Sequence, residues 1–312
     1  MHKRLLNEAV LDLTIVPQGP ILVKAGETGA DPTRPDMEFV RTWKDGQRVV
    51  YLPGPSLKGV IRSHCERIVR TVGKEGSCCN PVAKDQSCVK QRKLEQKHEG
   101  TYVHSHSCFV CQMFGNTVLA GRVRTKDAYP ISEVRTEERN GVAIDRVFGS
   151  VAVGPFQMEV VTQGKFQTTI AIRNFTIAQL GLLALALRDL KLGRVGVGFG
   201  KSRGLGHVTL EWGTLTVRYT RQPEDDHKLA GVALLLGKEE AEKYGYVAGN
   251  GAAFGYAAMG QDVSAELPGS LEMKDNEWGE WELKVPPEQV EAVWKSCIPA
   301  WRVAIRLEGG AG

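Results

Sequence analysis

The stretch Tyr51-Leu52-Pro53-Gly54-Pro55-Ser56-Leu57-Lys58-Gly59-Val60-Ile61-Arg62 joins a Pro-Gly turn directly to an amphipathic segment. Ser56 is a favoured N-cap residue, so a helix is predicted to begin there. Apolar residues then recur at helical spacing, namely Leu57, Val60, Ile61, Cys65, Ile68, Val69 and Val72. Lys58 and Arg62 fall on other faces, and cations beside a helix N-terminus favour phosphate binding. A capped surface helix with solvated charges is the plainer interpretation.

Three further motifs follow along the chain, namely Glu133-Val134-Arg135-Thr136-Glu137, Ile144-Asp145-Arg146 and Gly200-Lys201-Ser202-Arg203-Gly204-Leu205-Gly206. Together with the Pro-Gly helix start, they resemble the RAMP superfamily, in particular the repeated backbone subunits of type III CRISPR effector complexes. The resemblance extends over residues 10–220. It implies an RRM-like fold and three partners, which are a guide CRISPR RNA, a complementary target RNA and other RAMP subunits.

The formal net charge of +4 is divided unevenly along the 312 residues. Residues 1–220 carry 31 Lys and Arg against 20 Asp and Glu, whereas residues 221–312 carry 9 against 16. We therefore expect a basic RNA-binding core over residues 1–220 and an acidic C-terminal extension over residues 221–312. Ordinary solubility charge explains the total but not the division. The first residues lead into no apolar signal core and no apolar run is long enough to span a bilayer, so we expect a cytoplasmic protein without membrane contact.

Alternating and helical patterns predict an α+β chain with a ferredoxin-like, or RRM-like, βαββαβ core. Leu11, Leu13 and Ile15 alternate with polar residues in a first strand that ends at Pro17. Thr176 is the predicted N-cap of a second helix, which is apolar nearly all round and therefore expected to be buried. Further strands are predicted over residues 121–127, 156–162, 166–175 and 208–219.

Seven cysteines, mostly between residues 65 and 111, favour thiolate ligands for a metal over a disulfide framework. We expect an insertion over residues 76–112 to lack apolar anchors, so a structural Zn²⁺ would supply the free energy that orders it. The expected ligands are Cys79, Cys88, Cys108 and Cys111, and Cys78, His98, His104 or His106 remain open as the fourth. Free cysteines on a flexible loop are the alternative. Cys65 and Cys297 are predicted to lie in the core.

A second insertion, over residues 130–158, is polar and then turns glycine-rich and apolar. Arg135, Arg146 and Phe148 suit a β-hairpin that holds phosphates while an aromatic ring presses between bases. The resemblance identifies this segment as the thumb of a backbone subunit, which crosses the guide–target duplex and displaces a nucleotide. Phe148 is our choice for the wedging residue, and an ordinary surface hairpin is the alternative.

A glycine-rich loop over residues 193–206 follows a helix, whereas a nucleotide-binding glycine loop precedes one, so a Rossmann or P-loop site is excluded. Missing Cβ atoms would let a polyanion approach the main chain, with Lys201 and Arg203 supplying charge. A plain glycine-rich turn is the alternative. The resemblance implies that the guide RNA is held by this loop and the first helix, through Ser56, Lys58, Arg62, Lys201, Ser202 and Arg203.

We assign any cleavage chemistry to the acidic loop before the first helix, which has no histidine nearby. A carboxylate beside an RNA 2′-hydroxyl can hold a divalent cation, Mg²⁺ or Mn²⁺, or orient the nucleophile. Backbone subunits of the family use an aspartate in this loop, followed by an apolar pair and a basic residue. Asp36, with Phe39-Val40-Arg41 behind it, fits this pattern best, and Asp31 is the second candidate.

These features predict a guide-RNA-binding backbone subunit of a type III CRISPR effector complex that cleaves guide-complementary target RNA in a metal-dependent reaction. One alternative is a structural RNA-binding subunit without cleavage. Another is a guide-processing endoribonuclease, which would need a histidine base such as His64. In the acidic extension we expect a helix followed by a strand over residues 290–305 and four buried tryptophans, Trp278, Trp281, Trp294 and Trp301.

Overall fold

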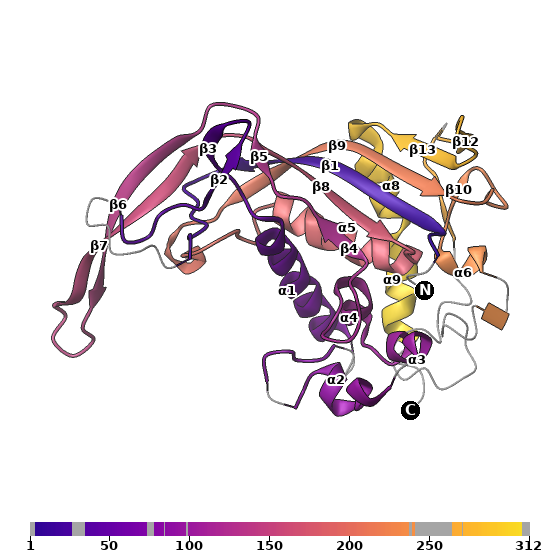
Figure 1. Ribbon diagram of the computed structural model, residues 1–312, viewed down its shortest axis with the longest axis horizontal. Helices are drawn as coiled ribbons and strands as arrows, with labels where there is room; N and C mark the ends of the chain where they lie inside the picture. The colour runs from indigo at the N-terminus through magenta and orange to yellow at the C-terminus, as the bar shows by residue number, and fades with distance from the viewer. Residues whose placement is uncertain are drawn as a thin grey trace.

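An antiparallel sheet crosses the molecule and carries helices on one face (Figure 1). The structure is a computed structural model that describes residues 4–26, 35–73, 78–83, 85–97, 99–236, 239–240, 264–269 and 271–307. The seven strands of this sheet are β1 (Asn7–Pro17), β4 (Val123–Thr125), β5 (Tyr129–Pro130), β8 (Phe166–Arg173), β9 (Val208–Tyr219), β12 (Lys274–Asp275) and β13 (Trp281–Val285). Their order is β12-β13-β9-β1-β8-β4, and β5 also pairs with β8. The predicted mixed α+β fold is confirmed.

Strand β1 lies between β9 and β8. Its side chains alternate between a buried and an open face of the sheet. Leu11 and Leu13 are buried, whereas Asp12 between them is exposed. Leu11 is paired with Leu215 of β9, so the apolar face continues across neighbouring strands. The strand ends at Pro17, as predicted.

Helices α1 (Gly54–Val72) and α5 (Ile177–Lys191) pack together beside the sheet. A capping box starts α5, in which Thr176 and Gln179 exchange hydrogen bonds, and most of its side chains are buried. The predicted cap and burial of this helix are therefore confirmed. Cys65 is buried on the inner face of α1, also as predicted.

Helix α1 begins two residues before its predicted N-cap, Ser56, so that assignment is wrong. Pro53 is the N-cap residue, and Pro55 follows in the first turn. Proline fixes φ near the helical value, which favours an early start. The N–H of Gly54 donates to the carboxylate of Asp127 at 2.7 Å. The first N–H of α1, which was expected to be available to a phosphate, is therefore already bonded to an acidic side chain of the protein.

The C-terminal part of the chain packs on the core through a strand and two helices. Strand β13 pairs with β9, while helices α8 (Val290–Ser296) and α9 (Ile298–Leu307) pack on α5. The predicted strand at this end is wrong, because Ala300, Trp301 and Ala304 are buried at helical spacing. In the described part of the chain no helix is long and apolar enough to cross a membrane.

The tryptophans of this region divide into buried and exposed ones. Trp294 and Trp301 are buried, as is Cys297 between them, and Trp281 is partly buried. Trp278 is 89% exposed, so the expectation of its burial is wrong. It lies in the turn between β12 and β13, where its backbone N–H donates to the side-chain oxygen of Asn276.

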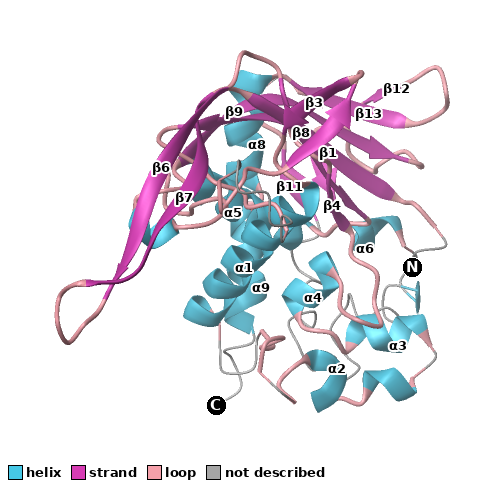
Figure 2. Ribbon diagram, turned by 60° about the vertical axis from the view of Figure 1, so that its left-hand side comes forward, coloured by secondary structure: helices cyan, strands magenta, loops and turns pink. Residues whose placement is uncertain are grey.

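The first insertion forms a small helical lobe beside α1 (Figure 2), made of α2 (Cys88–Gln91), η1 (Leu94–Gln96), α3 (Gly100–Ser105) and α4 (Phe109–Phe114). The expectation that this insertion lacks apolar anchors is wrong. Leu94, Val103 and Val110 are buried and belong to the hydrophobic core. Leu94 is flanked by Lys93 and Glu95, whereas Val110 belongs to a short, mostly apolar run that ends at Phe114.

The second insertion is a two-stranded arm that projects from the body (Figures 1 and 2). Strands β6 (Arg135–Ile144) and β7 (Val151–Gln163) form it, and they pair antiparallel. A shorter ribbon of β2 (Arg41–Lys44) and β3 (Gln47–Val50) lies beside β5. The remaining elements are η2 (Lys201–Arg203), β10 (Lys228–Ala230), α6 (Val232–Leu235), β11 (Ser264–Glu266) and η3 (Pro287–Gln289).

Candidate functional site

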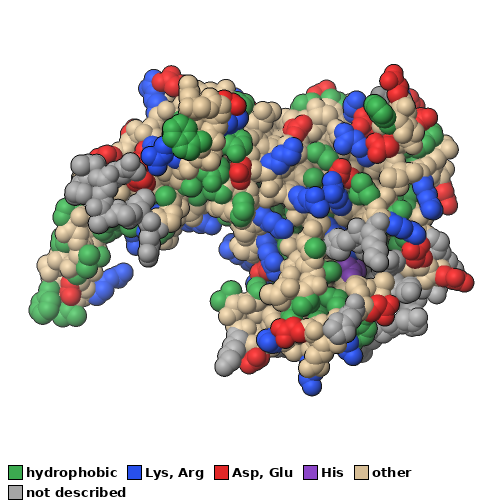
Figure 3. Space-filling model, viewed as in Figure 1, with side chains coloured by type: hydrophobic (Ala, Val, Ile, Leu, Met, Phe, Trp, Pro, Cys, Tyr) green, Lys and Arg blue, Asp and Glu red, His purple; other side chains and the backbone are tan. Residues whose placement is uncertain are grey.

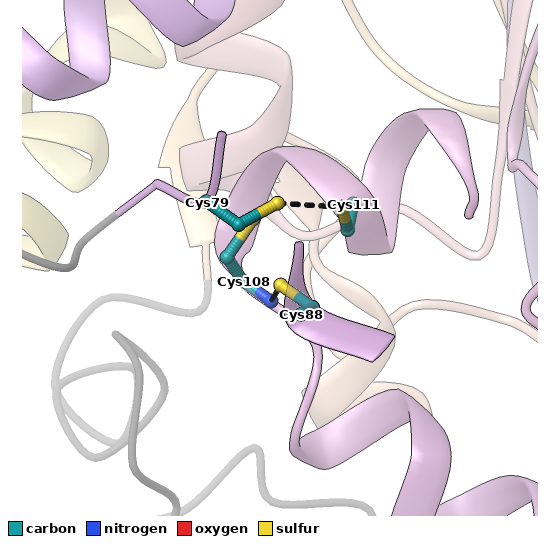
Figure 4. Close-up of side chains that lie close together, drawn as sticks. All are labelled: Cys79, Cys88, Cys108 and Cys111. Atoms are coloured by element: carbon teal, nitrogen blue, oxygen red, sulfur yellow. Dashed lines mark hydrogen bonds between the residues drawn. The ribbon is translucent and has the colours of Figure 1, made fainter. Parts of the chain in front are cut away.

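Four cysteines of the first insertion bring their sulfur atoms together (Figure 4). Cys79 follows α1, Cys88 begins α2, Cys108 precedes α4 and Cys111 lies within α4. All four are buried, and their sulfurs lie within 4.8 Å of one another. Sγ of Cys79 lies 3.5 Å from that of Cys111 and 3.7 Å from that of Cys108. Zinc–sulfur bonds of about 2.3 Å in a tetrahedron separate the sulfurs by about 3.8 Å, so the cluster could hold a metal such as zinc.

The other donors considered for the fourth ligand do not join this group. The Cys78 thiol is buried and interacts with Cys108, but it is not one of the four sulfurs that lie within 4.8 Å of one another. His104 is bonded to Arg122, and His106 stacks on a neighbouring tyrosine ring. His98 lies outside the described residues. The structure thus brings together the four cysteines that the sequence favours.

Arg62 of α1 ties the cysteine cluster to the helix. Its Nη2 lies 3.6 Å from Sγ of Cys111, its Nη1 donates to the carbonyl of Gly115 at 3.0 Å, and its Nε donates to Glu66 at 3.0 Å. Each guanidinium nitrogen of Arg62 therefore has a partner within the protein. Within the cluster, hydrogen bonds from Cys111 and neighbouring thiols hold the pKa of Cys108 well below its usual range, which favours the thiolate.

Two neighbouring basic side chains have no hydrogen-bonded or ion-paired partner among the described residues. Lys58 is in the first turns of α1, and Arg124 is on the neighbouring strand β4. Burial lowers the pKa of Lys58, and the charges of Arg62 and Arg124 lower it further. Figure 3 shows Lys and Arg side chains gathered above the hollow between the arm and the insertion lobe. Cations that repel one another at a protein surface favour the binding of a polyanion there.

The glycine-rich loop packs its backbone against the segment that follows β1. At Gly198, where φ is +82°, an added Cβ would lie 2.2 Å from the carbonyl oxygen of Leu22. The N–H of Phe199 donates to that same oxygen. Gly198 therefore serves the packing of the loop itself rather than the expected approach of a polyanion to bare backbone.

The charges of this loop lie at its exposed tip. Lys201, Ser202 and Arg203 form the short turn η2, and all three are exposed. Partial burial lowers the pKa of Lys201, and the nearby charge of Arg67 on α1 lowers it further. The loop and α1 thus present cations to the same region.

The tip of the arm is shaped by Asp145, whose carboxylate accepts hydrogen bonds from the N–H groups of Phe148 at 2.8 Å and Val147 at 2.7 Å. These two bonds hold the pKa of Asp145 below its usual range. Arg146 and Phe148 project into solvent, and Phe148 is 84% exposed. Arg135 is exposed at the other end of β6. Asp145 therefore builds the turn that presents a cation and an aromatic ring.

Asp36 lies beside the root of the arm and is exposed. Its Oδ2 accepts a hydrogen bond of 2.8 Å from the backbone N–H of Gln157 on β7. The N–H of Met37 donates to the carbonyl of the same Gln157 at 3.0 Å, so the loop runs along the strand. Asp31, the second catalytic candidate, lies outside the described residues.

His64 of α1 is buried, and its Nε2 lies 2.8 Å from a carboxylate oxygen of Asp189 on α5. Arg188 and Arg194 donate to the other oxygen of this carboxylate. Burial raises the pKa of Asp189, but the hydrogen bonds from His64 and Arg188 outweigh it and hold the pKa below its usual range. His64 thus joins the two helices inside the protein.

Comparison with known families assigns the region that contains these features. The RAMP superfamily matches residues 14–209, from within β1 to the first residues of β9. The chain belongs to the RAMP superfamily. This membership indicates a CRISPR-associated RNA-binding subunit that works with RNA and partner subunits. No curated protein matches the chain.

The match to the RAMP superfamily spans α1, both insertions and the glycine-rich loop, whereas β13, α8 and α9 lie beyond it. Arg124 is the basic residue that sequence reasoning missed in this RAMP chain. Its signal was the alternation Arg122-Val123-Arg124 within a predicted strand. Only the packing of β4 against α1 shows that Arg124 meets Lys58.

Proposed function

We propose that this RAMP protein is a guide-RNA-binding backbone subunit of a type III CRISPR effector complex that cleaves guide-complementary target RNA. The observation that carries the proposal is the pair Lys58 and Arg124, which repel each other and have no acidic partner among the described residues. Two phosphates of an RNA backbone would relieve this repulsion and release counterions. The cations of turn η2, Lys201 and Arg203, extend the same surface.

The guide RNA lies along α1 and the glycine-rich loop in this proposal. Lys58, Lys201 and Arg203 bind phosphates, while Ser56 and Ser202 offer hydroxyl groups from exposed or partly exposed turns. Arg62 acts differently, because its guanidinium is engaged by Glu66, Gly115 and Cys111. It adds positive charge and fixes the insertion lobe against α1.

The arm is proposed to cross the duplex of guide and target. Arg146 and Phe148 at the tip have no core behind them, so they are free to contact a nucleic acid. The Phe148 ring displaces one nucleotide by pressing between bases, and Arg146 binds a phosphate beside it. Arg135, at the other end of β6, binds a phosphate further along the RNA. The turn built by Asp145 supports this geometry without touching RNA.

Asp36 is the proposed catalytic residue, acting with Mg²⁺ or Mn²⁺ on the target strand where that strand passes the root of the arm. The 2′-hydroxyl loses its proton to a base, the carboxylate of Asp36 or water, as its oxygen attacks the adjacent phosphorus. The bond from phosphorus to the 5′-oxygen breaks, and the 5′-oxygen takes up a proton from water. The products are a 2′,3′-cyclic phosphate and a 5′-hydroxyl. Its exposure and its position at the root of the arm support Asp36. Asp31 remains the second candidate.

The cysteine cluster is proposed to hold one structural Zn²⁺. Four buried sulfurs at tetrahedral separations fit the ion, and four protein ligands leave no position for water or substrate. The zinc would therefore order the insertion lobe beside α1 rather than take part in cleavage. Arg62 would balance the negative charge of the bound thiolates.

We further propose that β1, α1, β4, β8, α5 and β9 form a ferredoxin-like core within residues 1–220, with residues 221–312 as an extension. The order β9-β1-β8-β4, all antiparallel, supports this arrangement because β1 and β8 are the central pair. Strand β13 then lengthens the sheet at its β9 edge.

The experiment is to assemble the complex with its guide and add guide-complementary RNA labelled at its 5′ end, with Mg²⁺ or with EDTA. Cleavage at regular intervals in Mg²⁺ and none in EDTA supports the proposal. Binding without cleavage supports the alternative of a structural subunit. Trimming of the guide precursor instead would support a processing enzyme, although the burial of His64 against Asp189 disfavours it.

A further inference from the structure

The β2–β3 ribbon exposes a tryptophan together with a cation. Trp43 on β2 is 73% exposed, and Arg48 on β3 is directly opposite in the strand pairing. Directly opposed residues share one face of a ribbon, so the indole and the guanidinium are neighbours. A single exposed tryptophan is ordinary on a protein surface, so only the surroundings of Trp43 can indicate a ligand.

The ribbon is held in place on both faces. Arg41, on the face of Trp43, donates through Nη1 to Glu159 of β7 at 2.7 Å. On the opposite face, the Nζ of Lys44 lies 4.3 Å from the centre of the Tyr129 ring. A two-stranded ribbon is marginally stable alone, so these contacts fix it and keep the indole in solvent.

The charge around Trp43 distinguishes it from the other strongly exposed tryptophan, Trp278. Three basic residues of the ribbon and one carboxylate lie near Trp43, namely Arg41, Lys44, Arg48 and Asp45. Three acidic residues and one lysine lie near Trp278, namely Asp275, Glu277, Glu280 and Lys274. Basic neighbours attract phosphate and acidic neighbours repel it. Both indoles are largely exposed, so the opposite net charge of their neighbours favours nucleic acid at Trp43 over Trp278.

A groove of about 660 Å³ lies on the other face of the ribbon, and Lys44, Lys126 and Tyr129 line it. The Tyr129 ring stacks on Tyr51 with ring centres 6.0 Å apart. The groove also contains two carboxylates, Asp12 and Asp127, and each accepts a hydrogen bond from the protein. Aromatic rings and cations thus occur on both sides of the ribbon, as in surfaces that bind single strands.

The ribbon continues the segment that carries the proposed catalytic residue. From Asp36 to Arg41 the chain is bonded to β7 at the root of the arm, and Trp43 follows two residues later on the same face as Arg41. Asp36 and Trp43 therefore belong to one continuous stretch of chain that is bonded to β7.

We propose that Trp43 stacks on an unpaired base of single-stranded RNA and that Arg48 binds an adjacent phosphate. The inference rests on the proposed RNA-binding function and adds a contact outside α1, the arm and the glycine-rich loop. Stacking on an indole tolerates every base, so this contact adds affinity without sequence preference.

The test uses the full chain and a fluorescently labelled single-stranded RNA of guide sequence, with Kd measured at several salt concentrations. Trp43→Ala is expected to weaken binding about fivefold to a hundredfold with an unchanged salt dependence, because no charge is lost. Trp43→Phe should restore most of the affinity, and the matched control Trp278→Ala should change nothing. Arg48→Gln should reduce the slope of log K against log salt by about one.

A second assay, in which labelled target RNA is added to the guide-loaded complex, tells which of the two RNA strands Trp43 contacts. If Trp43→Ala weakens RNA binding in the first assay, the stacked base belongs to the guide. If it weakens RNA binding only in the second assay, the stacked base belongs to the target. Unchanged affinity of Trp43→Ala in both assays, while the unmodified chain binds RNA, overturns the inference and leaves the proposed function intact. Normal RNA binding with lost assembly overturns it in favour of a protein partner. Absence of RNA binding by the unmodified chain and complex overturns both proposals.

Discussion

The carboxylate of Asp36 accepts a hydrogen bond of 2.8 Å from the backbone N–H of Gln157, which ties the loop before α1 to the root of the arm. The proposed catalytic carboxylate therefore also holds a strand in place. Alanine at this position removes both the charge and the hydrogen-bond acceptor. Asparagine keeps an acceptor oxygen and removes only the charge, so it separates chemistry from support.

Asp36→Asn is expected to lower the rate of metal-dependent cleavage of complementary RNA about a hundredfold or more, because general acid–base and metal chemistry need the ionised carboxylate. Guide affinity should stay unchanged. Cleavage is measured in the assembled complex, with Asp275→Asn, an exposed carboxylate on β12, as the matched control. An unchanged rate in Asp36→Asn would remove this residue from the mechanism and leave Asp31 as the candidate.

Elemental analysis of the purified chain should find about one zinc per molecule. Cys79→Ser should lose most of this zinc, because it removes one of four ligands, and should loosen the insertion lobe. Cys78→Ser is the matched control, since Cys78 is the adjacent buried cysteine outside the cluster. Equal zinc content in the two variants would refute the four-cysteine site.

Lys58→Glu should weaken guide RNA binding and reduce the slope of log K against log salt, because one phosphate contact is lost and a repulsion is gained. Lys274→Glu, at an exposed lysine in the acidic extension, should leave both quantities unchanged. Kd for the guide at several salt concentrations checks this expectation. Identical salt dependence in Lys58→Glu and the unmodified chain would move the RNA path away from α1.

Arg62→Gln should act on the fold more than on RNA. The variant loses bonds to Glu66, Gly115 and Cys111, so zinc should be removed faster by a chelator. The rate of zinc release measures this effect, with Arg67→Gln, an exposed residue of the same helix, as control. Equal release rates would mean that Arg62 does not support the cluster.

The ion pair of Arg41 and Glu159 predicts a pH dependence of stability. Burial raises the pKa of Glu159, but hydrogen bonds from Arg41 and from the N–H of Phe39 outweigh it and hold the pKa below its usual range. A lowered folded-state pKa contributes stability above the unfolded value of about 4.3, and this contribution is lost as the pH falls through the folded-state value.

Glu159→Gln should therefore lower the free energy of unfolding by about 1–3 kcal/mol at pH 7, and the difference from the unmodified chain should shrink as the pH falls below about 4. Denaturant unfolding at a series of pH values measures it. Glu138→Gln is the control, because Glu138 is paired with Glu159 across the arm but is exposed. A difference that stays constant with pH would mean that the charge of Glu159 contributes nothing.

Local patterns in the sequence account for the elements that were predicted correctly. Alternation around Leu11 and Leu13 marks β1, and the pair Thr176 and Gln179 starts α5 through bonds three residues apart. The spacing of Cys108 and Cys111 forms half of the cysteine cluster within one helical turn. Each of these features depends on neighbours in the chain, so composition and periodicity reveal it.

Contacts between distant segments decided the rest. Asp127 accepts a hydrogen bond from the first N–H of α1, Arg124 meets Lys58, and Asp36 binds β7. None of these pairs has a signal within a few residues. The sequence alone therefore determined β1, α5 and the set of cysteines, because these follow from hydrogen bonds and burial repeated at short range. Only the tertiary structure decided which charges are bound within the protein and which remain for RNA, because that depends on which distant segments the sheet and the arm bring together.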